Sequence, residues 1–131
     1  MLSLWVGKVS SPEKTVDDVW KFMQCKLPKP KVLMRSQRRT GLYWPNREEL
    51  PFRHTITLRE DSWKKMTEAE KKLTTIHESL HACGVSHQPG FRTSLDEVAH
   101  IVYLKIYGAD DDWKKFEASL NDRIEKFKQK K

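Results

Sequence analysis

The residues with the clearest chemical signature are two histidines and one glutamate close together in the chain. His77 and His81 are four residues apart, and Glu78 directly follows the first histidine, which gives the pattern HExxH. On a helix, residues four apart share one face, so both imidazoles can direct a ring nitrogen at the same metal ion. Glu78 projects beside that face, where its carboxylate can take a proton from a metal-bound water.

A third histidine extends this pattern. His87 follows His81 by six residues, with Gly84 midway, which completes the longer motif HExxHxxGxxH. Glycine enters the left-handed region without a Cβ penalty, so a helix can end at Gly84 and the chain can return His87 toward the ion. Three imidazoles leave a fourth position for water, as in catalytic Zn²⁺ sites. We therefore expect one zinc ion on His77, His81 and His87, with Glu78 as the catalytic base for hydrolysis of peptide bonds.

The motif resembles the zinc-binding signature of the metzincin family of metallopeptidases at every fixed position. Residues 94–108 are also similar to the C-terminal helix of matrixin-type domains. The strand expected at 54–59 sits where metzincins place the edge strand that binds extended substrate. This resemblance spans roughly residues 52–108 and implies a minimal zinc metalloendopeptidase. One departure is that no methionine follows His87, whereas metzincins carry a methionine turn beneath the metal.

A second resemblance is to SprT-like and WLM-type proteases, which act on DNA–protein crosslinks and lack the methionine turn. Segment 87–91 (HQPGF) is similar to the sequence around their third zinc histidine. The net charge of +7, with basic clusters in 26–39 and 126–131, permits nucleic acid as a partner. No RNA-binding signature, zinc-finger spacing or Gly-rich phosphate loop accompanies these clusters. The alternatives are thus a DNA-associated protease and a non-catalytic zinc- or nucleic-acid-binding module.

Other residues compete for places in such a site. Glu97 is the main rival for the third ligand, because gluzincins use a glutamate from a later helix, but it is better explained as the capping-box partner of Ser94. His54 and His100 have no matching ligand spacing. Two tyrosines could donate a hydrogen bond to a tetrahedral intermediate, although their helical spacing fits core packing equally well: Tyr103 and Tyr107.

The two cysteines, Cys25 and Cys83, indicate neither a disulfide framework nor a cysteine zinc site by count and spacing. We expect both thiols to be reduced, with Cys25 in the core and not blocking zinc as a pro-segment cysteine does in some metzincins. The N-terminus does not resemble a signal peptide, and no stretch approaches the roughly 20 apolar residues that span a bilayer. These features predict a cytoplasmic protein with a peptide or protein substrate and no membrane partner.

Length and patterning predict a single domain over residues 1–131. Strands are expected at 2–8, 31–36 and 54–59, while 37–51 has the composition of an irregular segment in which Tyr43 and Trp44 could line a substrate pocket. Helices are expected after a turn at Pro12 with a capping box at Thr15–Asp18, from Thr67 to Gly84, over 94–108 and over 110–129.

An apolar stripe on the last helix is expected to pack on the core: Trp113, Phe116, Leu120, Ile124 and Phe127. Strands at the start and helices at the end of the chain are typical of an α+β arrangement. The predicted fold is therefore α+β, a small twisted mixed sheet with an active-site helix carrying HExxH and C-terminal helices packed on it.

Overall fold

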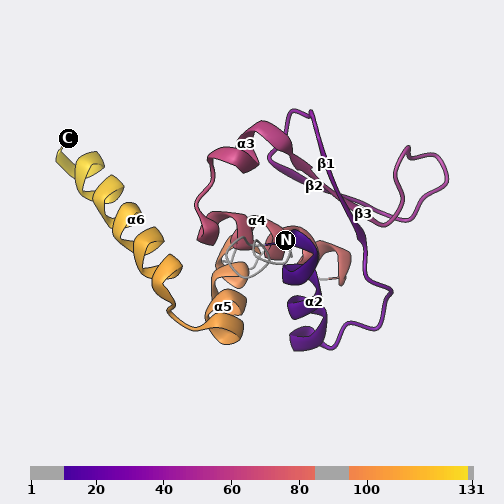
Figure 1. Cartoon of the computed structure of the whole chain (residues 1–131), viewed down its shortest axis with the longest axis horizontal. Helices are drawn as coiled ribbons and strands as arrows, with labels where there is room; N and C mark the ends of the chain where they lie inside the picture. The colour runs from indigo at the N-terminus through magenta and orange to yellow at the C-terminus, as the bar shows by residue number, and fades with distance from the viewer. Residues whose placement is uncertain (1–10, 85–94, 130–131) are drawn as a thin grey trace, which may run out of the picture.

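The computed structural model describes residues 11–84 and 95–129, which form an α+β fold with one small mixed sheet (Figure 1). This confirms the predicted fold class. Helices α2, α4 and α5 pack together beside the sheet (Figure 1). In chain order the elements are α2 (Pro12–Met23), β1 (Lys31–Arg35), β2 (Gly41–Trp44), β3 (Thr55–Arg59), α3 (Glu60–Lys65), α4 (Glu68–Ala82), α5 (Leu95–Tyr107) and α6 (Asp111–Gln129).

Strand β3 is the centre of the sheet. It pairs in parallel with β1, where Val32 lies opposite Ile56, and antiparallel with β2, where Tyr43 lies opposite Ile56. The expectation that residues 54–59 form a substrate-binding edge strand is therefore wrong. In the described sheet, the edge strand beside α4 is β2. It lies within the segment 37–51, which the sequence predicted to be irregular. Because β2 has only four residues and is bounded by turn formers, its alternation of apolar and polar residues is too short to be recognised.

The core lies between the sheet and helices α2 and α4. Ile56 and Leu58 of β3 are fully buried together with Val19 of α2 and with Ile76 and Leu80 of α4. Residues two apart share one face of a strand and residues four apart share one face of a helix, so these pairs bring the two elements together. The packing fixes how α4 is rotated against the sheet, and therefore where its histidines point.

Helix α2 begins earlier than the sequence pattern predicted. Ser11 is its N-cap, with Oγ accepting the Lys14 N–H at 3.4 Å, and Pro12 occupies the first turn. Proline has no N–H and a fixed φ, both of which suit that position. Thr15 lies inside the helix and donates its hydroxyl proton to the Ser11 carbonyl. The predicted turn at Pro12 and the capping box at Thr15 are therefore wrong.

Helix α4 begins and ends as predicted. Thr67 Oγ1 accepts the Glu70 N–H at 3.2 Å, and Glu70 Oε1 accepts the Thr67 N–H at 3.1 Å, which is a complete capping box. After the helix ends at Ala82, Gly84 has a φ of +100°, the left-handed conformation that glycine allows. The short helix α3 directly before it is an element that sequence patterning missed.

The two C-terminal helices lie within the predicted ranges, but the last one packs less than expected. Trp113 of α6 is buried, whereas Leu120, Ile124 and Phe127 are 37%, 43% and 63% exposed. Figure 1 shows α6 extending away from the other helices. The predicted packing of the whole stripe on the core is therefore wrong beyond the first turns of α6, where these apolar side chains are exposed.

Three predicted features fall outside the described residues: the strand at 2–8, His87 and the Ser94 cap. Among the helices of the described ranges, none combines the length and apolarity needed to cross a membrane. A location in the cytoplasm stays a prediction.

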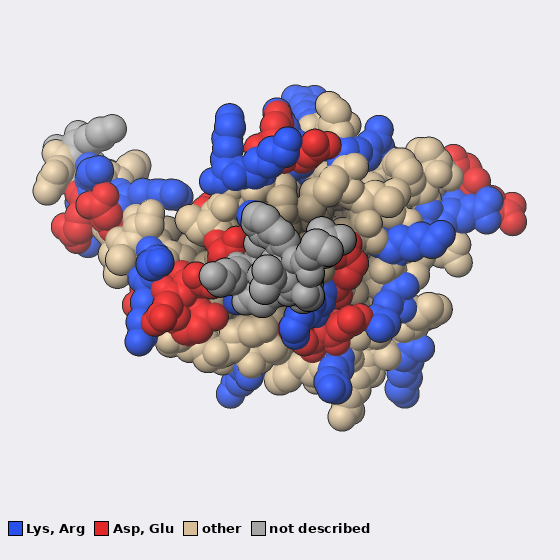
Figure 2. Space-filling view, in the orientation of Figure 1, with Lys and Arg blue, Asp and Glu red and all other residues tan. Residues whose placement is uncertain are grey.

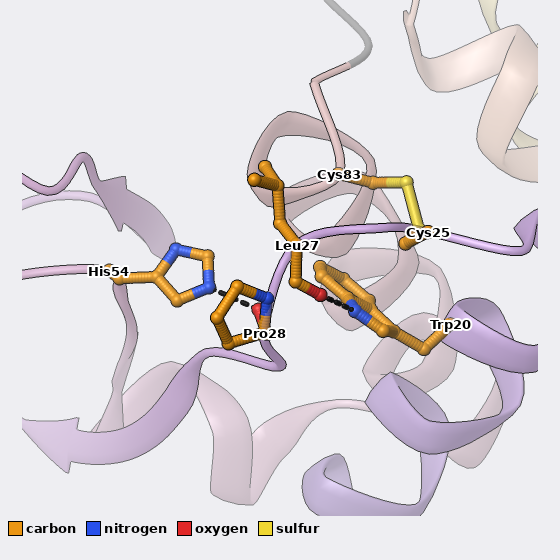
Figure 3. The surroundings of a disulfide bond; sticks show 6 residues. All are labelled: Trp20, Cys25, Leu27, Pro28, His54 and Cys83. Atoms are coloured by element: carbon orange, nitrogen blue, oxygen red, sulfur yellow. Dashed lines mark hydrogen bonds between the residues drawn. A yellow bond between two sulfur atoms is a disulfide. The ribbon is translucent and has the colours of Figure 1, made fainter.

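Cys25 and Cys83 form a disulfide bond, with their Cα atoms 5.6 Å apart (Figure 3). The prediction of two reduced cysteines is wrong, because the partners are 58 residues apart and their meeting depends on tertiary packing. The loop after Cys25 is held by the Trp20 indole N–H, which donates to the Leu27 carbonyl at 2.7 Å. The bridge fastens the C-terminal end of α4 to this loop, and such bonds persist in oxidising compartments.

Candidate active site

The two motif histidines lie on one side of α4, next to its core-facing side. His77 and His81 each follow a buried residue, Ile76 and Leu80, so they are rotated by about 100° from the core-facing direction. Their ring centroids are 5.1 Å apart with the planes at 63°. Both side chains are half-buried. The predicted pair of imidazoles is therefore brought together by the helix.

Glu78 is packed against the edge strand. Its residue is only 8% exposed, and a Cβ built on Gly41 of β2 would lie 3.1 Å from Glu78 Oε2 and 3.2 Å from its Cγ. The absence of a side chain at Gly41 therefore leaves the space that the carboxylate occupies. Burial raises the pKa of Glu78 above its ordinary value, and the nearby His77 and Arg39 only partly oppose that shift.

Two adjoining hollows meet at this carboxylate, between β2 and the helices. Both are lined by Gly41, His77 and Glu78. The first hollow is completed by Arg39, Leu42, Tyr43, Pro45 and His81. The second is completed by Thr40, Leu73, Thr74, Asp96, Ala99 and His100. His77 thus lines both the hollow that contains the other motif histidine and the hollow that contains an acidic side chain of α5.

Of the two aromatic residues expected to line a pocket, only Tyr43 does so. Its hydroxyl and His54 Nδ1 are 2.7 Å apart, while the other ring nitrogen of His54 hydrogen-bonds the Pro28 carbonyl (Figure 3). Burial raises the pKa of Tyr43. Trp44 points to the opposite face of the sheet, where its indole N–H donates to Thr57 Oγ1 at 2.8 Å, because successive strand residues alternate.

Asp96, in the first turn of α5, is a site residue that sequence patterning missed. Its Oδ1 lies 2.7 Å from His77 Nδ1. The buried Leu95 and Ala99 hold this end of α5 within the core cluster. Glu97, the rival third ligand, is the next residue and has an exposed side chain. The only sequence signal was an acidic first turn, which helix capping explains equally well.

The remaining candidates have structural partners elsewhere. The Tyr103 hydroxyl donates to Asp110 Oδ1 at 2.8 Å, and the Tyr107 hydroxyl donates to Asp18 Oδ2 at 2.7 Å. His100 borders the second hollow, with its ring edge-on to Trp113 at 5.5 Å between centroids. Tyr103 is buried in the core and Tyr107 packs against it, which is the packing role that their helical spacing fitted.

The described donors fit a zinc ion in kind but not in number. Two imidazoles share one face of α4, with a buried carboxylate beside them, and imidazole nitrogen is a preferred Zn²⁺ donor. Within residues 11–84 and 95–129, no group of three or more His, Cys, Asp or Glu side chains is arranged to hold an ion. A third ligand has to come from beyond these ranges or by movement within them, and the motif predicts His87.

Comparison of the chain with protein-family models, with curated proteins and with solved structures gave no match. The resemblances to metzincins and to SprT-like or WLM-type proteases therefore stay predictions.

Proposed function

We propose that this chain is a zinc-dependent metallopeptidase in which His77, His81 and His87 hold the metal and Glu78 is the catalytic base. One observation carries the proposal: the two imidazoles lie 5.1 Å apart between ring centroids on a half-buried face of α4, with Glu78 beside them in the same hollow. A structural metal site needs ligands but no base. The position of Glu78 therefore favours an enzyme over a zinc-binding module.

The chemistry depends on where Glu78 is held. Zn²⁺ bound at the histidines would polarise the scissile carbonyl and lower the pKa of a water to about 7. Glu78 takes a proton from the attacking water at its carboxylate and then passes it to the leaving amine. Packing against Gly41 holds this carboxylate in one place, so proton transfer does not wait for a side chain to find its position.

The substrate is expected to lie along β2. Among residues 11–84 and 95–129 this strand pairs with β3 alone, so its other edge can accept hydrogen bonds from an added chain. Extended peptides commonly bind in this way to sheet edges. Leu42 and Tyr43 line the hollow that also contains His81 and Glu78, so a peptide bound along this edge passes the base.

A DNA-associated protease is the second candidate, and it rests on charge. The net charge is +7, but on the face shown in Figure 2 basic and acidic side chains are interspersed. Nucleic-acid binding usually shows a basic patch on one face. We favour the general peptidase because it rests on the observed grouping of His77, Glu78 and His81.

The test is proteolysis by the full chain loaded with one equivalent of Zn²⁺, using an unfolded protein and a quenched fluorescent peptide library as substrates. Glu78→Gln should bind zinc normally but lose activity by a factor of about 10²–10⁴, because it removes the base and keeps the shape. The matched control Glu125→Gln, on the exposed part of α6, should retain full activity. Equal turnover by Glu78→Gln and the wild type would contradict the proposal.

A further inference from the structure

We infer that Asp96 is a positioning residue for the metal site: its carboxylate fixes the tautomer and orientation of His77, so that Nε2 of that ring is presented to the metal. The inference rests on the proposed function and adds a residue from a different helix to its site. It begins from the 2.7 Å contact between His77 Nδ1 and Asp96 Oδ1.

The contact defines which nitrogen carries the proton. An ionised carboxylate only accepts hydrogen bonds, so the ring nitrogen that faces it is the donor, Nδ1–H. In the neutral ring the lone pair is then on Nε2, the form that binds a metal. Nδ1 and Nε2 point out of different sides of the imidazole, so a carboxylate at Nδ1 and a metal at Nε2 do not collide.

The two hollows beside His77 agree with this assignment. Asp96 lines one of the two hollows that His77 borders, whereas His81 lines the other. Glu78 lines both hollows. An ion shared by the two motif histidines belongs in the hollow that both of them line, and Asp96 does not line that hollow. Asp96 is therefore a partner of a ligand and not a ligand itself.

Packing of α5 on α4 places Asp96 where it can do this. Leu95 and Ala99, which flank it on the helix, are each only 2% exposed. The carboxylate also lies in the first helical turn, where a negative charge is favoured by the helix dipole. The Asp96 side chain is 77% exposed, while that of His77 is 23% exposed. The backbone of Asp96 is therefore anchored by its neighbours, and its principal described contact is the histidine.

Hydrogen-bonded carboxylates behind metal-binding histidines typically change metal affinity by a factor of about 10–100. We therefore expect Asp96→Ala to weaken Zn²⁺ binding about 10–100-fold, measured by competition with a chromophoric chelator. Asp96→Asn keeps an oxygen acceptor at the same place and should recover most of that loss. Glu125→Gln, which removes an exposed carboxylate on α6 away from both hollows, is the control and should bind as the wild type does.

A second readout needs no metal. In the metal-free protein, nitrogen chemical shifts of the His77 ring should show the Nδ1–H tautomer in the wild type and in Asp96→Asn. Asp96→Ala should shift the ring toward the Nε2–H tautomer that free imidazole side chains prefer. Circular dichroism of each variant checks that the helices are intact.

The outcomes are separable from those of the proposed function. Wild-type affinity and an unchanged tautomer in Asp96→Ala would overturn the inference and leave the peptidase proposal standing. Complete loss of zinc in both Asp96 variants would also overturn it, by making Asp96 a direct ligand. A wild type that binds no zinc contradicts the proposed function, and the tautomer measurement then decides on Asp96 independently.

Discussion

At the scale of single residues, the proposed base depends on a position that carries no side chain. Gly41 faces α4 from the edge strand, and the Glu78 carboxylate fills the space that a Cβ would need. The nearest atom of another residue to that Cβ is Thr74 Cγ2, at 3.3 Å, which lies one turn before Glu78 on the same face of α4. Gly41 is not among the residues with positive φ, so a substitution there acts through this contact and not through backbone strain.

We predict that Gly41→Ala lowers peptidase activity by up to about 100-fold while the free energy of unfolding changes little. The added methyl group would push the Glu78 carboxylate from its place by a few tenths of an ångström. A misplacement of about 1 Å can cost about 100-fold in rate, which sets the upper limit of the loss. Activity at saturating substrate and urea unfolding of the same sample are the two measurements.

The matched control is Gly108→Ala. A Cβ there meets nothing within 4 Å, but Gly108 has a φ of +72°. This variant should lose stability, by about 1 kcal/mol, and keep its activity. Full activity in Gly41→Ala would show that the carboxylate tolerates displacement.

At this scale, whether a contact could be predicted from the sequence depends on how far apart its residues are in the chain. His77, Glu78 and His81 are one local pattern on one helix, so their grouping could be predicted and is confirmed. Gly41 and Asp96 reach the site from elements that are distant in the chain, and neither has a characteristic spacing. His87 lies outside the described residues, so its place as third ligand stays a prediction.

At the scale of elements, α4 is secured at both ends. A capping box closes its N-terminus, and Cys83 at its C-cap is bonded to Cys25. The loop beyond Cys25 is itself held by Trp20 and His54 (Figure 3). His54 in turn contacts Tyr43 of the first hollow. The bridge therefore constrains both the helix that carries the motif and a loop linked to the hollow beside it.

We predict that removal of the disulfide by Cys25→Ser with Cys83→Ser lowers the free energy of unfolding by about 2–4 kcal/mol, because the unfolded chain is no longer constrained by a large loop. Urea unfolding with and without dithiothreitol measures this. The reductant should destabilise the wild type and leave the double variant unchanged. Two titratable thiols in the native wild type would contradict the bridge.

Helices with complete local signals were predictable, as the Thr67 capping box and Gly84 show for α4. Short elements were not. Strand β2 is stabilised by pairing with β3, and α3 is a six-residue helix with no side-chain cap. Both depend on their surroundings more than on their own sequence. The edge position of β2, on which the substrate proposal depends, could only come from the sheet order.

At the scale of the whole molecule, a polar network joins the helices. Asp110 accepts hydrogen bonds from the Tyr103 hydroxyl and from the Trp113 N–H, and it lies 3.5 Å from Lys72 Nζ of α4. Burial alone would raise the pKa of Asp110, but these donors outweigh it and lower that pKa. For Tyr103, burial and the bond to Asp110 both raise the pKa well above its usual 10.0.

This network predicts a loss of stability in alkaline solution. Above pH 10 the unfolded chain loses the Tyr103 proton while the folded protein keeps it, so the stabilisation is complete below that pH and falls as the pH rises. The slope is at most about 1.4 kcal/mol per pH unit for this group. Urea unfolding at pH 8 to 11 should show a shallower decline for Tyr103→Phe; equal slopes in both proteins would contradict this role.

The most direct test of the proposed metal centre is the zinc content of the purified chain by elemental analysis. Wild type, His77→Ala, His81→Ala and His87→Ala are compared after equal exposure to the metal, with circular dichroism to confirm folding. We expect about one zinc per chain in the wild type and a sharp reduction in each variant. Zinc kept by His87→Ala alone would move the third ligand to Glu97 or Asp96. A wild type without zinc, or zinc retained when His77 or His81 is removed, would contradict the account.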